Sequence, residues 1–177
     1  MKAARIVKPK EALQVQELET PKPKGSQVLV KVLSSSVCHS DIHLWEGGYE
    51  GPGGQFLKTI DRGVKYPVTP GHEITGKIES IGEEAEDRFA KDDTVLVYPW
   101  VGEGLCPACR IGEENLCDKP KSLGIYTDGG YSDQLQISCK DRRGFSLTAY
   151  NGYGVLEFVN IKSVRFYDEL VHHHHVE

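Results

Sequence analysis

The chain has 177 residues, with 21 basic and 26 acidic side chains and a formal net charge of −5. This length fits one domain that buries a core without disulfides, and 38% hydrophobic against 27% charged residues excludes a disordered polypeptide. The mild negative charge argues against nucleic-acid and membrane-surface partners. No apolar run approaches the roughly 20 residues that span a bilayer. The start lacks a signal-peptide pattern, so we expect a cytoplasmic protein.

Short β-strands dominate the predicted elements. Segments rich in β-branched residues, or alternating apolar with polar residues, follow one another along the chain. They are residues 3–7, 13–17, 28–33, 74–81, 94–98, 129–137, 155–161 and 163–167. Residues 46–71 are rich in glycine and proline and predict a long loop. We see no well-capped amphipathic helix, which favours a mainly β fold with few short helices.

Three cysteines lie close together, at Cys106, Cys109 and Cys117. Cysteines two residues apart can direct both thiolates onto one ion, and the carboxylate of Glu103 would complete a tetrahedral Zn²⁺ site. A closed set of four ligands leaves no position for water, so the ion would be structural. Unrelated buried or disulfide-paired thiols are the less favoured alternative. Residues 113–114 offer other carboxylates near Glu103.

A second group of metal-ligand residues is dispersed along the chain. Cys38 follows a predicted strand, and His72 and Glu73 open another. They offer one sulfur, one nitrogen and one oxygen, and three protein ligands with an open position are typical of catalytic zinc. Asp41 is a natural partner for the other ring nitrogen of His72. Spacing alone leaves an alternative open, in which Cys38 is a buried structural residue and Ser40 and Asp41 serve a cap or turn.

These motifs resemble the medium-chain, zinc-dependent alcohol dehydrogenases, from residue 1 to about residue 138. Residues 71–85 match the zinc signature of that family, residues 37–41 look like its catalytic-cysteine segment, and residues 102–112 resemble its structural-zinc lobe. Glutamate at position 103, where most members have cysteine, is similar to thermophilic archaeal NAD-dependent members. The resemblance implies a GroES-like, partly open β-barrel with an irregular zinc-binding lobe.

The resemblance also implies chemistry, namely hydride exchange between NAD(P) and a small alcohol or carbonyl substrate. Cys38 and His72 would bind a catalytic Zn²⁺, which acts as a Lewis acid. Glu73 would be a ligand that comes and goes, or a carboxylate close to the ligands. A second Zn²⁺ would occupy the structural lobe.

The family assigns roles to four more positions of this sequence. Ser40 would hydrogen-bond the substrate oxygen and pass its proton toward His43. His39 occupies the position that faces the cofactor pyrophosphate, and Trp100 would line the substrate pocket.

The sequence departs from the family pattern in three places. Asp92 stands where glycine is usual, and aspartate tolerates a positive-φ turn better than most residues. Residues 139–177 contain no match to the distal cysteine ligand of the catalytic zinc. We expect Cys139 to be a lone or buried thiol, and its use as a substitute ligand is the less favoured alternative. Residues 152–154 lack the third glycine of a dinucleotide-binding turn, so we expect no nucleotide-binding domain.

We therefore expect a catalytic domain over residues 1–138 and a divergent tail over residues 139–177 that ends in a run of four histidines. Our hypothesis for the tail is a truncated or frameshifted gene, and the rival is a small protein whose tail strands complete the barrel. The predicted function is an alcohol dehydrogenase catalytic domain that is inactive alone. The alternatives are a non-catalytic zinc-binding GroES-like module and an oligomeric, chaperonin-like barrel. Each of these interpretations is compatible with a homo-oligomer, and the sequence does not decide the oligomeric state.

Overall fold

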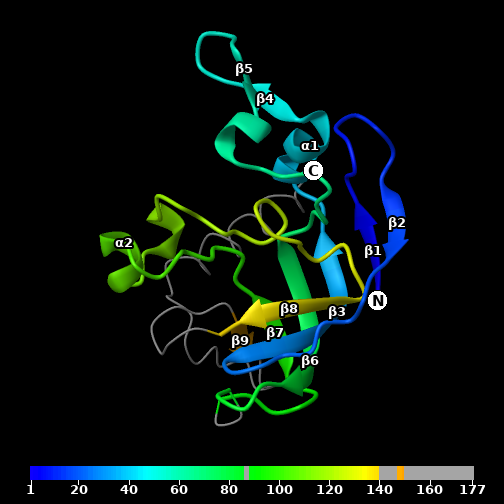
Figure 1. The fold of residues 1–177 in the computed structure, drawn as a ribbon, viewed down its shortest axis with the longest axis vertical. Helices are drawn as coiled ribbons and strands as arrows, with labels where there is room; N and C mark the ends of the chain where they lie inside the picture. The colour runs from blue at the N-terminus through cyan, green and yellow to red at the C-terminus, as the bar shows by residue number, and fades with distance from the viewer. Residues whose placement is uncertain (86–87, 140–146, 150–177) are drawn as a thin grey trace, which may run out of the picture.

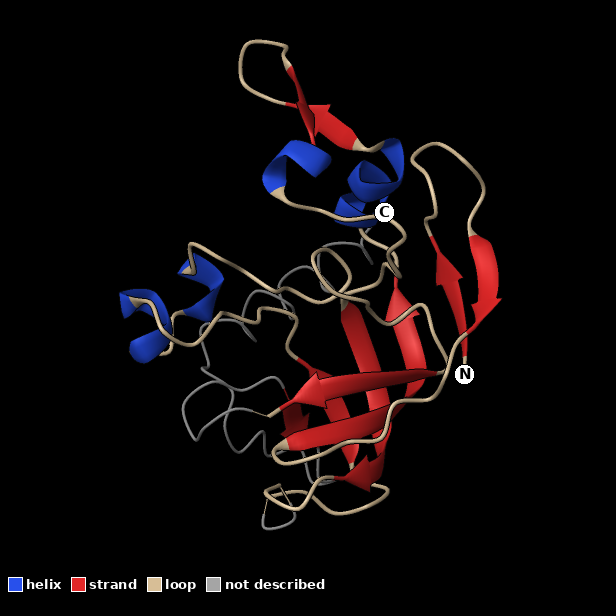
Figure 2. Ribbon diagram, viewed as in Figure 1, coloured by secondary structure: helices blue, strands red, loops and turns tan. Residues whose placement is uncertain are grey.

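The structure is a computed structural model that describes residues 1–85, 88–139 and 147–149. The strands are β1 (Lys2–Arg5), β2 (Gln14–Glu17), β3 (Gln27–Ser36), β4 (Gly48–Glu50), β5 (Phe56–Lys58), β6 (Glu73–Ile81), β7 (Thr94–Val97), β8 (Gln134–Ser138) and β9 (Leu147–Ala149). The helices are α1 (His39–Glu46) and α2 (Pro107–Arg110), with 3₁₀ turns at Ile60–Arg62 and Glu114–Leu116. The prediction of a mainly β fold with few short helices is confirmed (Figure 2).

A five-stranded antiparallel sheet, in the order β8-β3-β6-β7-β9, forms the centre of the molecule (Figure 1). Two smaller antiparallel sheets, β1-β2 and β4-β5, stand apart from it. The described strands do not close into a barrel, because β8 and β9 remain at opposite edges of the main sheet. Every strand ladder of the described residues is antiparallel, so they contain no parallel nucleotide-binding sheet.

The main core lies on one face of this sheet. Alternate residues of a strand point to the same face, and the β-branched and leucine residues at these alternate positions are almost completely buried. They include Val28, Val30, Ile74, Ile78, Val95, Val97, Leu135 and Ile137. The predicted strands at 28–33, 74–81, 94–98 and 129–137 therefore correspond to β3, β6, β7 and β8. This core holds β3 and β6 side by side, which is the pairing that builds the first site described below.

A second, smaller core fixes α1 against the segment before β6. Leu44 of α1 packs with Ile6, Val64 and Val68, and all four are at most 3% exposed. The hydroxyl of Tyr66 donates to the carbonyl of Leu44 at 2.6 Å. The N-terminal residues and the segment around residues 64–68 thus hold one side of α1 in place.

Residues 46–71 are more ordered than the predicted loop. They form the β4-β5 hairpin, which projects from the top of the molecule in Figure 1, and the 3₁₀ turn at Ile60–Arg62. Sequence reasoning also did not locate α1, a short helix that begins with a capping box but is only weakly amphipathic. Both were missed for chemical reasons, because glycine-rich hairpins carry little β propensity and the N-cap residue of α1 is a cysteine, which is not a favoured cap.

Two expectations about single residues agree with the structure. Asp92 adopts φ of 70°, which agrees with the positive-φ turn that the usual glycine of the resembling family implies at this position. Cys139 is a free thiol, 2% exposed, packed in the main core. Within the tail, Leu147–Ala149 pairs with β7 as β9, whereas the predicted strands at 155–161 and 163–167 and the turn at 152–154 lie outside the described residues.

Candidate active site and metal centres

The adjoining ends of β3 and β6 carry the dispersed group of candidate ligands. Ser36, the last residue of β3, pairs with Glu73, the first residue of β6. This register places Cys38, just beyond β3, beside His72, just before β6. Sγ of Cys38 lies 3.0 Å from Nε2 of His72. With a carboxylate oxygen of Glu73, these ligand atoms all lie within 4.8 Å of one another.

Cys38 is also the residue that begins α1. Its Sγ accepts the backbone N–H of Ser40 at 3.3 Å, and its own N–H donates to Oδ2 of Asp41 at 3.0 Å. The two bonds form a capping box, which satisfies N–H groups that the first turn of a helix leaves unpaired. The cap therefore fixes the position of Cys38 Sγ relative to the helix. The predicted cap or turn role for Ser40 and Asp41 and the ligand role of Cys38 are compatible.

Asp41 connects this cap to His72. The residue is 6% exposed, and its Oδ1 accepts the backbone N–H of Gly71 at 2.9 Å. The same Oδ1 lies 3.5 Å from Nδ1 of His72. That distance suits an ion pair with a protonated ring and is longer than a well-formed hydrogen bond. With Asp41 on the Nδ1 side, Nε2 of His72 faces Cys38, the orientation that a metal-binding histidine needs.

The protonation of this pair follows from their contact. Burial alone would raise the pKa of Asp41, but His72 and the N–H donors of Cys38 and Gly71 outweigh burial and leave the pKa below its usual 3.8. Asp41 in turn raises the pKa of His72 above 6.5, against the opposing effect of burial. A metal ion on Nε2 must therefore compete with a proton that Asp41 favours.

Tyr131, which follows the Gly129–Gly130 turn before β8, also reaches this site. Its hydroxyl lies 3.3 Å from Oδ2 of Asp41 and 3.3 Å from the carbonyl oxygen of Ser36. Burial, and then the carboxylate of Asp41, raise the pKa of Tyr131, so the phenol stays protonated and donates. Sequence reasoning missed this residue, because only the folded chain brings Tyr131 to Asp41.

The remaining predicted site residues lie on α1 and beyond β7. The rings of His39 and His43 have centroids 4.5 Å apart, and Nδ1 of His43 is 3.8 Å from a carboxylate oxygen of Glu46. Ser40 is exposed in the first turn of α1. Trp100 is 44% exposed, in a segment joined by backbone hydrogen bonds to residues 121–123. The roles predicted for these residues stay predictions.

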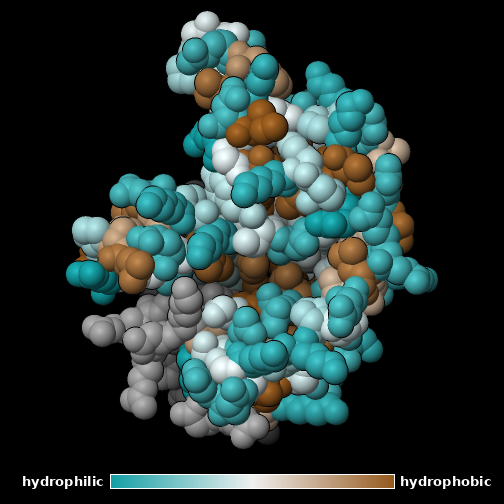
Figure 3. All heavy atoms as spheres, in the orientation of Figure 1, coloured by the Kyte–Doolittle hydropathy of each residue, from teal (hydrophilic) through white to brown (hydrophobic). Residues whose placement is uncertain are grey.

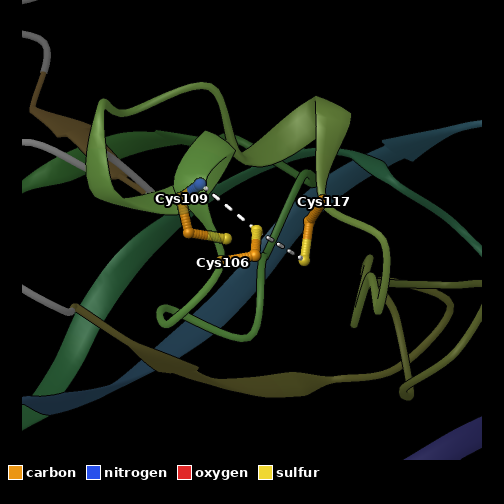
Figure 4. Close-up of side chains that lie close together, drawn as sticks. All are labelled: Cys106, Cys109 and Cys117. Carbon is orange, nitrogen blue, oxygen red and sulfur yellow. Dashed lines mark hydrogen bonds between the residues drawn. The ribbon is translucent and has the colours of Figure 1, made fainter.

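The second cluster lies in the lobe that we define as residues 102–120. Figure 4 shows the sulfur atoms of its three cysteines turned toward one another, with Cys106 just before α2, Cys109 within α2 and Cys117 after the 3₁₀ turn at Glu114–Leu116. Sγ of Cys106 and of Cys117 are 3.9 Å apart, and the three sulfur atoms lie within 4.8 Å of one another. Glu103 is tied to this cluster through its backbone, whose N–H donates to Sγ of Cys117 at 3.4 Å. The carboxylate of Glu103 is not part of the group of ligand atoms that lie within 4.8 Å of one another, so its role as a fourth ligand stays a prediction.

The three thiols do not share one environment. The backbone N–H of Cys109 donates to Sγ of Cys106 at 3.4 Å and is the first cause of a lowered pKa at Cys106. Desolvation raises the pKa of Cys109 to about 11. Thiolates, not thiols, bind zinc, so a metal ion would displace the proton of Cys109.

The lobe has little core of its own. Cys117 is 8% exposed, whereas Leu105, Ile111 and Leu116 are 70%, 76% and 65% exposed. Figure 3 shows apolar atoms reaching the surface of this lobe, at the left of the molecule. A metal ion held by the three thiolates would supply the cross-link that apolar packing does not.

A family model for the alcohol dehydrogenase GroES-like domain matches residues 24–141. The chain belongs to this family. Over 137 residues the chain is 51% identical to the NAD-dependent alcohol dehydrogenase of Saccharolobus solfataricus, and 47% identical to that of Sulfurisphaera tokodaii. Each match covers 77% of this chain and 38% of the relative. The chain therefore spans less than half of the length of these alcohol dehydrogenases.

Solved alcohol dehydrogenase structures share the fold. The alcohol dehydrogenase of Aeropyrum pernix is similar with a TM-score of 0.69 at 29% identity, over 93% of this chain and 42% of that one. The cobalt- and zinc-bound thermostable alcohol dehydrogenase of Pyrobaculum aerophilum has a TM-score of 0.66 at 27% identity, over 85% of this chain and 41% of its own. These likenesses agree with the GroES-like expectation. In the described part of the chain, no helix has the length and apolar character needed to cross a bilayer.

Proposed function

We propose that this chain is the catalytic domain of a zinc-dependent alcohol dehydrogenase, with the zinc held by Cys38, His72 and Glu73. The observation that carries the proposal is the 3.0 Å approach of Cys38 Sγ and His72 Nε2, with Glu73 alongside. Zinc bonds to sulfur and nitrogen measure about 2.3 Å and about 2.0 Å, so one ion can contact both atoms. One thiolate, one imidazole and one carboxylate form a donor set that zinc accepts.

When bound, zinc would supply Lewis-acid polarisation of an alcohol or carbonyl oxygen. The other steps belong to the side chains around it. Asp41 holds the ring of His72 in its ligand orientation through Nδ1. The hydroxyl of Ser40 would hydrogen-bond the substrate oxygen and pass its proton toward the imidazole of His43, whose Nδ1 lies 3.8 Å from a carboxylate oxygen of Glu46.

The lobe would hold a second, structural zinc through Cys106, Cys109 and Cys117, with Glu103 as the proposed fourth ligand. Support comes from the convergence of the three sulfur atoms. Rotation of the Glu103 side chain toward the sulfur atoms would complete a tetrahedron, because its backbone already contacts Cys117. Such a closed set leaves no position for substrate.

NAD is the proposed hydride acceptor, since relatives at 51% and 47% identity are NAD-dependent. His39 would face its pyrophosphate, and Trp100 would border a small alcohol or carbonyl substrate. The described residues contain no nucleotide-binding sheet, so turnover would require that domain from elsewhere. We propose that residues 1–138 form the catalytic domain and that residues 139–177 are a divergent tail.

A non-catalytic zinc-binding module is the second candidate. It is favoured by one observation, namely that the described residues contain no nucleotide-binding sheet. Such a module would keep the metal of the lobe and have no substrate position at His72.

Cobalt(II) substitution tests the proposal against this alternative. The cobalt-loaded chain is titrated with a short primary alcohol while the d–d absorption of the ion is followed. A saturable spectral change that is lost in Cys38→Ser and kept in Cys139→Ser supports an open position at the first site. A spectrum that the alcohol leaves unchanged contradicts the enzyme proposal and favours the module.

A further inference from the structure

Tyr131 lies where the three segments that build the first site come together. Its backbone N–H donates to the carbonyl of Pro70 at 3.0 Å, and its carbonyl accepts the N–H of Ala4 at 2.7 Å. The preceding Gly130 donates its N–H to the carbonyl of Gly71 at 2.8 Å. The Tyr131 backbone is thus attached directly to the residues that precede His72.

The ring of Tyr131 packs against Gly71. A Cβ placed on Gly71 would lie 2.5 Å from Cδ1 of Tyr131 and 2.7 Å from Oγ of Ser35, closer than real Cβ atoms approach. Gly71 also has φ of 91°, which disfavours a side chain. The ring therefore occupies the space that any larger residue at position 71 would need, directly beside the candidate ligand His72.

The hydroxyl of Tyr131 joins the other two segments. It is 3.3 Å from the carbonyl of Ser36, at the end of β3, and 3.3 Å from Oδ2 of Asp41, in the first turn of α1. Oδ2 of Asp41 is the atom that accepts the N–H of Cys38, and Oδ1 is the atom beside His72. One phenol thereby contacts the carboxylate that orients both candidate ligands.

We propose that Tyr131 is a positioning residue of the catalytic metal centre, acting through Asp41 on Cys38 and His72. This inference rests on the proposed function, since it assumes that the first site binds metal. Hydrogen-bonded partners of metal ligands typically contribute about 10–100-fold to metal affinity. Because the hydroxyl contacts Asp41 and not a ligand itself, and because both of its contacts are long, its expected contribution is at the low end, about tenfold.

Tyr131→Phe tests the proposal, because it keeps the ring against Gly71 and removes only the hydroxyl. Each variant is titrated with ¹¹³Cd²⁺ against a chelator, and cadmium NMR distinguishes the one-thiolate site at Cys38 from the three-thiolate site of the lobe. Tyr126→Phe is the matched control, since within the described residues the Tyr126 hydroxyl makes no hydrogen bond. The expected result is a cadmium affinity about tenfold lower at the Cys38 site in Tyr131→Phe, with the lobe and the control unchanged.

A double-mutant cycle with Asp41→Asn shows whether the effect passes through Asp41. Asparagine keeps an oxygen for the N–H of Cys38 and removes the charge that faces His72. The retained amide oxygen carries no charge, so it accepts a weaker hydrogen bond from Tyr131, and the effect of Tyr131→Phe should be clearly smaller in that background. An unchanged affinity in Tyr131→Phe, an equal loss in Tyr126→Phe, or a full effect in the Asp41→Asn background would each overturn the positioning role while leaving the metal site intact. A wild-type chain that binds cadmium only in the lobe would instead overturn the proposed function, and this inference with it.

Discussion

The two cysteine-containing clusters of this chain are assembled in different ways. Cys106, Cys109 and Cys117 come from one short irregular segment, and their neighbours Leu105 and Ile111 are exposed. Cys38 and His72 are 34 positions apart and meet because β3 and β6 pair above a fully buried core. Under the proposed function the first arrangement would depend on a metal ion for its stability, whereas the second is preformed by the sheet and by the buried carboxylate of Asp41.

Cys106→Ser should produce the largest effect, because the lobe lacks a core that could replace the metal. Structural zinc contributes about 10–16 kcal/mol in small zinc peptides. We expect loss of metal from the lobe and loss of hydrogen-exchange protection for residues 102–120, with β3, β6 and β8 still protected. Elemental analysis and hydrogen exchange measure the two parts. A lobe that keeps its hydrogen-exchange protection without metal, or a main sheet that also loses protection, would contradict the proposed difference between the two regions.

Ile74→Ala should affect the sheet-built site and spare the lobe. Ile74 follows Glu73 on β6 and is completely buried, and truncations of this kind cost about 2–5 kcal/mol of unfolding free energy. Leu116→Ala is the matched control in the lobe, where a side chain 65% exposed should change stability by at most about 0.5 kcal/mol. Denaturant unfolding measures the free energy of unfolding of both variants. Equal destabilisation by the two substitutions would remove the distinction between the regions.

Asp41→Ala should weaken both the cap of α1 and the orientation of His72. Loss of an N-terminal capping partner costs about 1 kcal/mol, and the buried N–H of Gly71 left without its acceptor costs about 1–3 kcal/mol more. We therefore expect about 2–4 kcal/mol of destabilisation, with metal lost at Cys38 and kept in the lobe. Thermal unfolding measures the loss of stability, and metal analysis measures the metal content of the two sites. A variant as stable as wild type that keeps both metals would show that the sheet alone preforms the site.

The smallest expected effect is a pH dependence of the metal-free chain. Because the pKa of His72 is raised in the folded chain, its protonated ring contributes fully to folding stability below pH 6.5. This contribution to stability is lost as the pH rises through the folded pKa of His72. Because the pKa of Asp41 is lowered in the folded chain, its carboxylate contributes fully to folding stability above pH 3.8. This contribution to stability is lost as the pH falls through the folded pKa of Asp41. The pair should stabilise the metal-free chain most between about pH 3.8 and 6.5. NMR titration of His72 in wild type and Asp41→Asn measures this, and the pKa of His72 should be lower in the variant. Equal pKa values in both chains would exclude Asp41 as the cause.

The sequence was sufficient for the features that depend on local pattern. The β-branched runs that became β3, β6 and β7 could be located, and the close spacing of Cys106 and Cys109 indicated that their sulfur atoms lie together. The positive φ of Asp92 could also be anticipated, because the resembling family usually has glycine at this position. In each case the relevant chemistry lies within a few consecutive residues.

The features that were missed depend on contacts between distant segments. Tyr131 meets Asp41 across 90 positions, which no spacing rule can indicate. The start of α1 is capped by a cysteine, so it lacks the usual serine, threonine or aspartate signal. The β4-β5 hairpin forms from a glycine-rich stretch whose pairing, and not its propensity, defines the strands.

Zinc content per chain distinguishes a protein with two metal sites from one with a metal only in the lobe. Elemental analysis of the wild-type chain should give two zinc ions, and Cys38→Ser and Cys106→Ser should each lose one, from the sheet-built site and from the lobe respectively. Cys139→Ser, which alters a buried thiol of the main core, should keep both. A single zinc that is lost only in Cys106→Ser would contradict the proposed catalytic zinc site, because Cys38 and His72 would then lie together without binding metal.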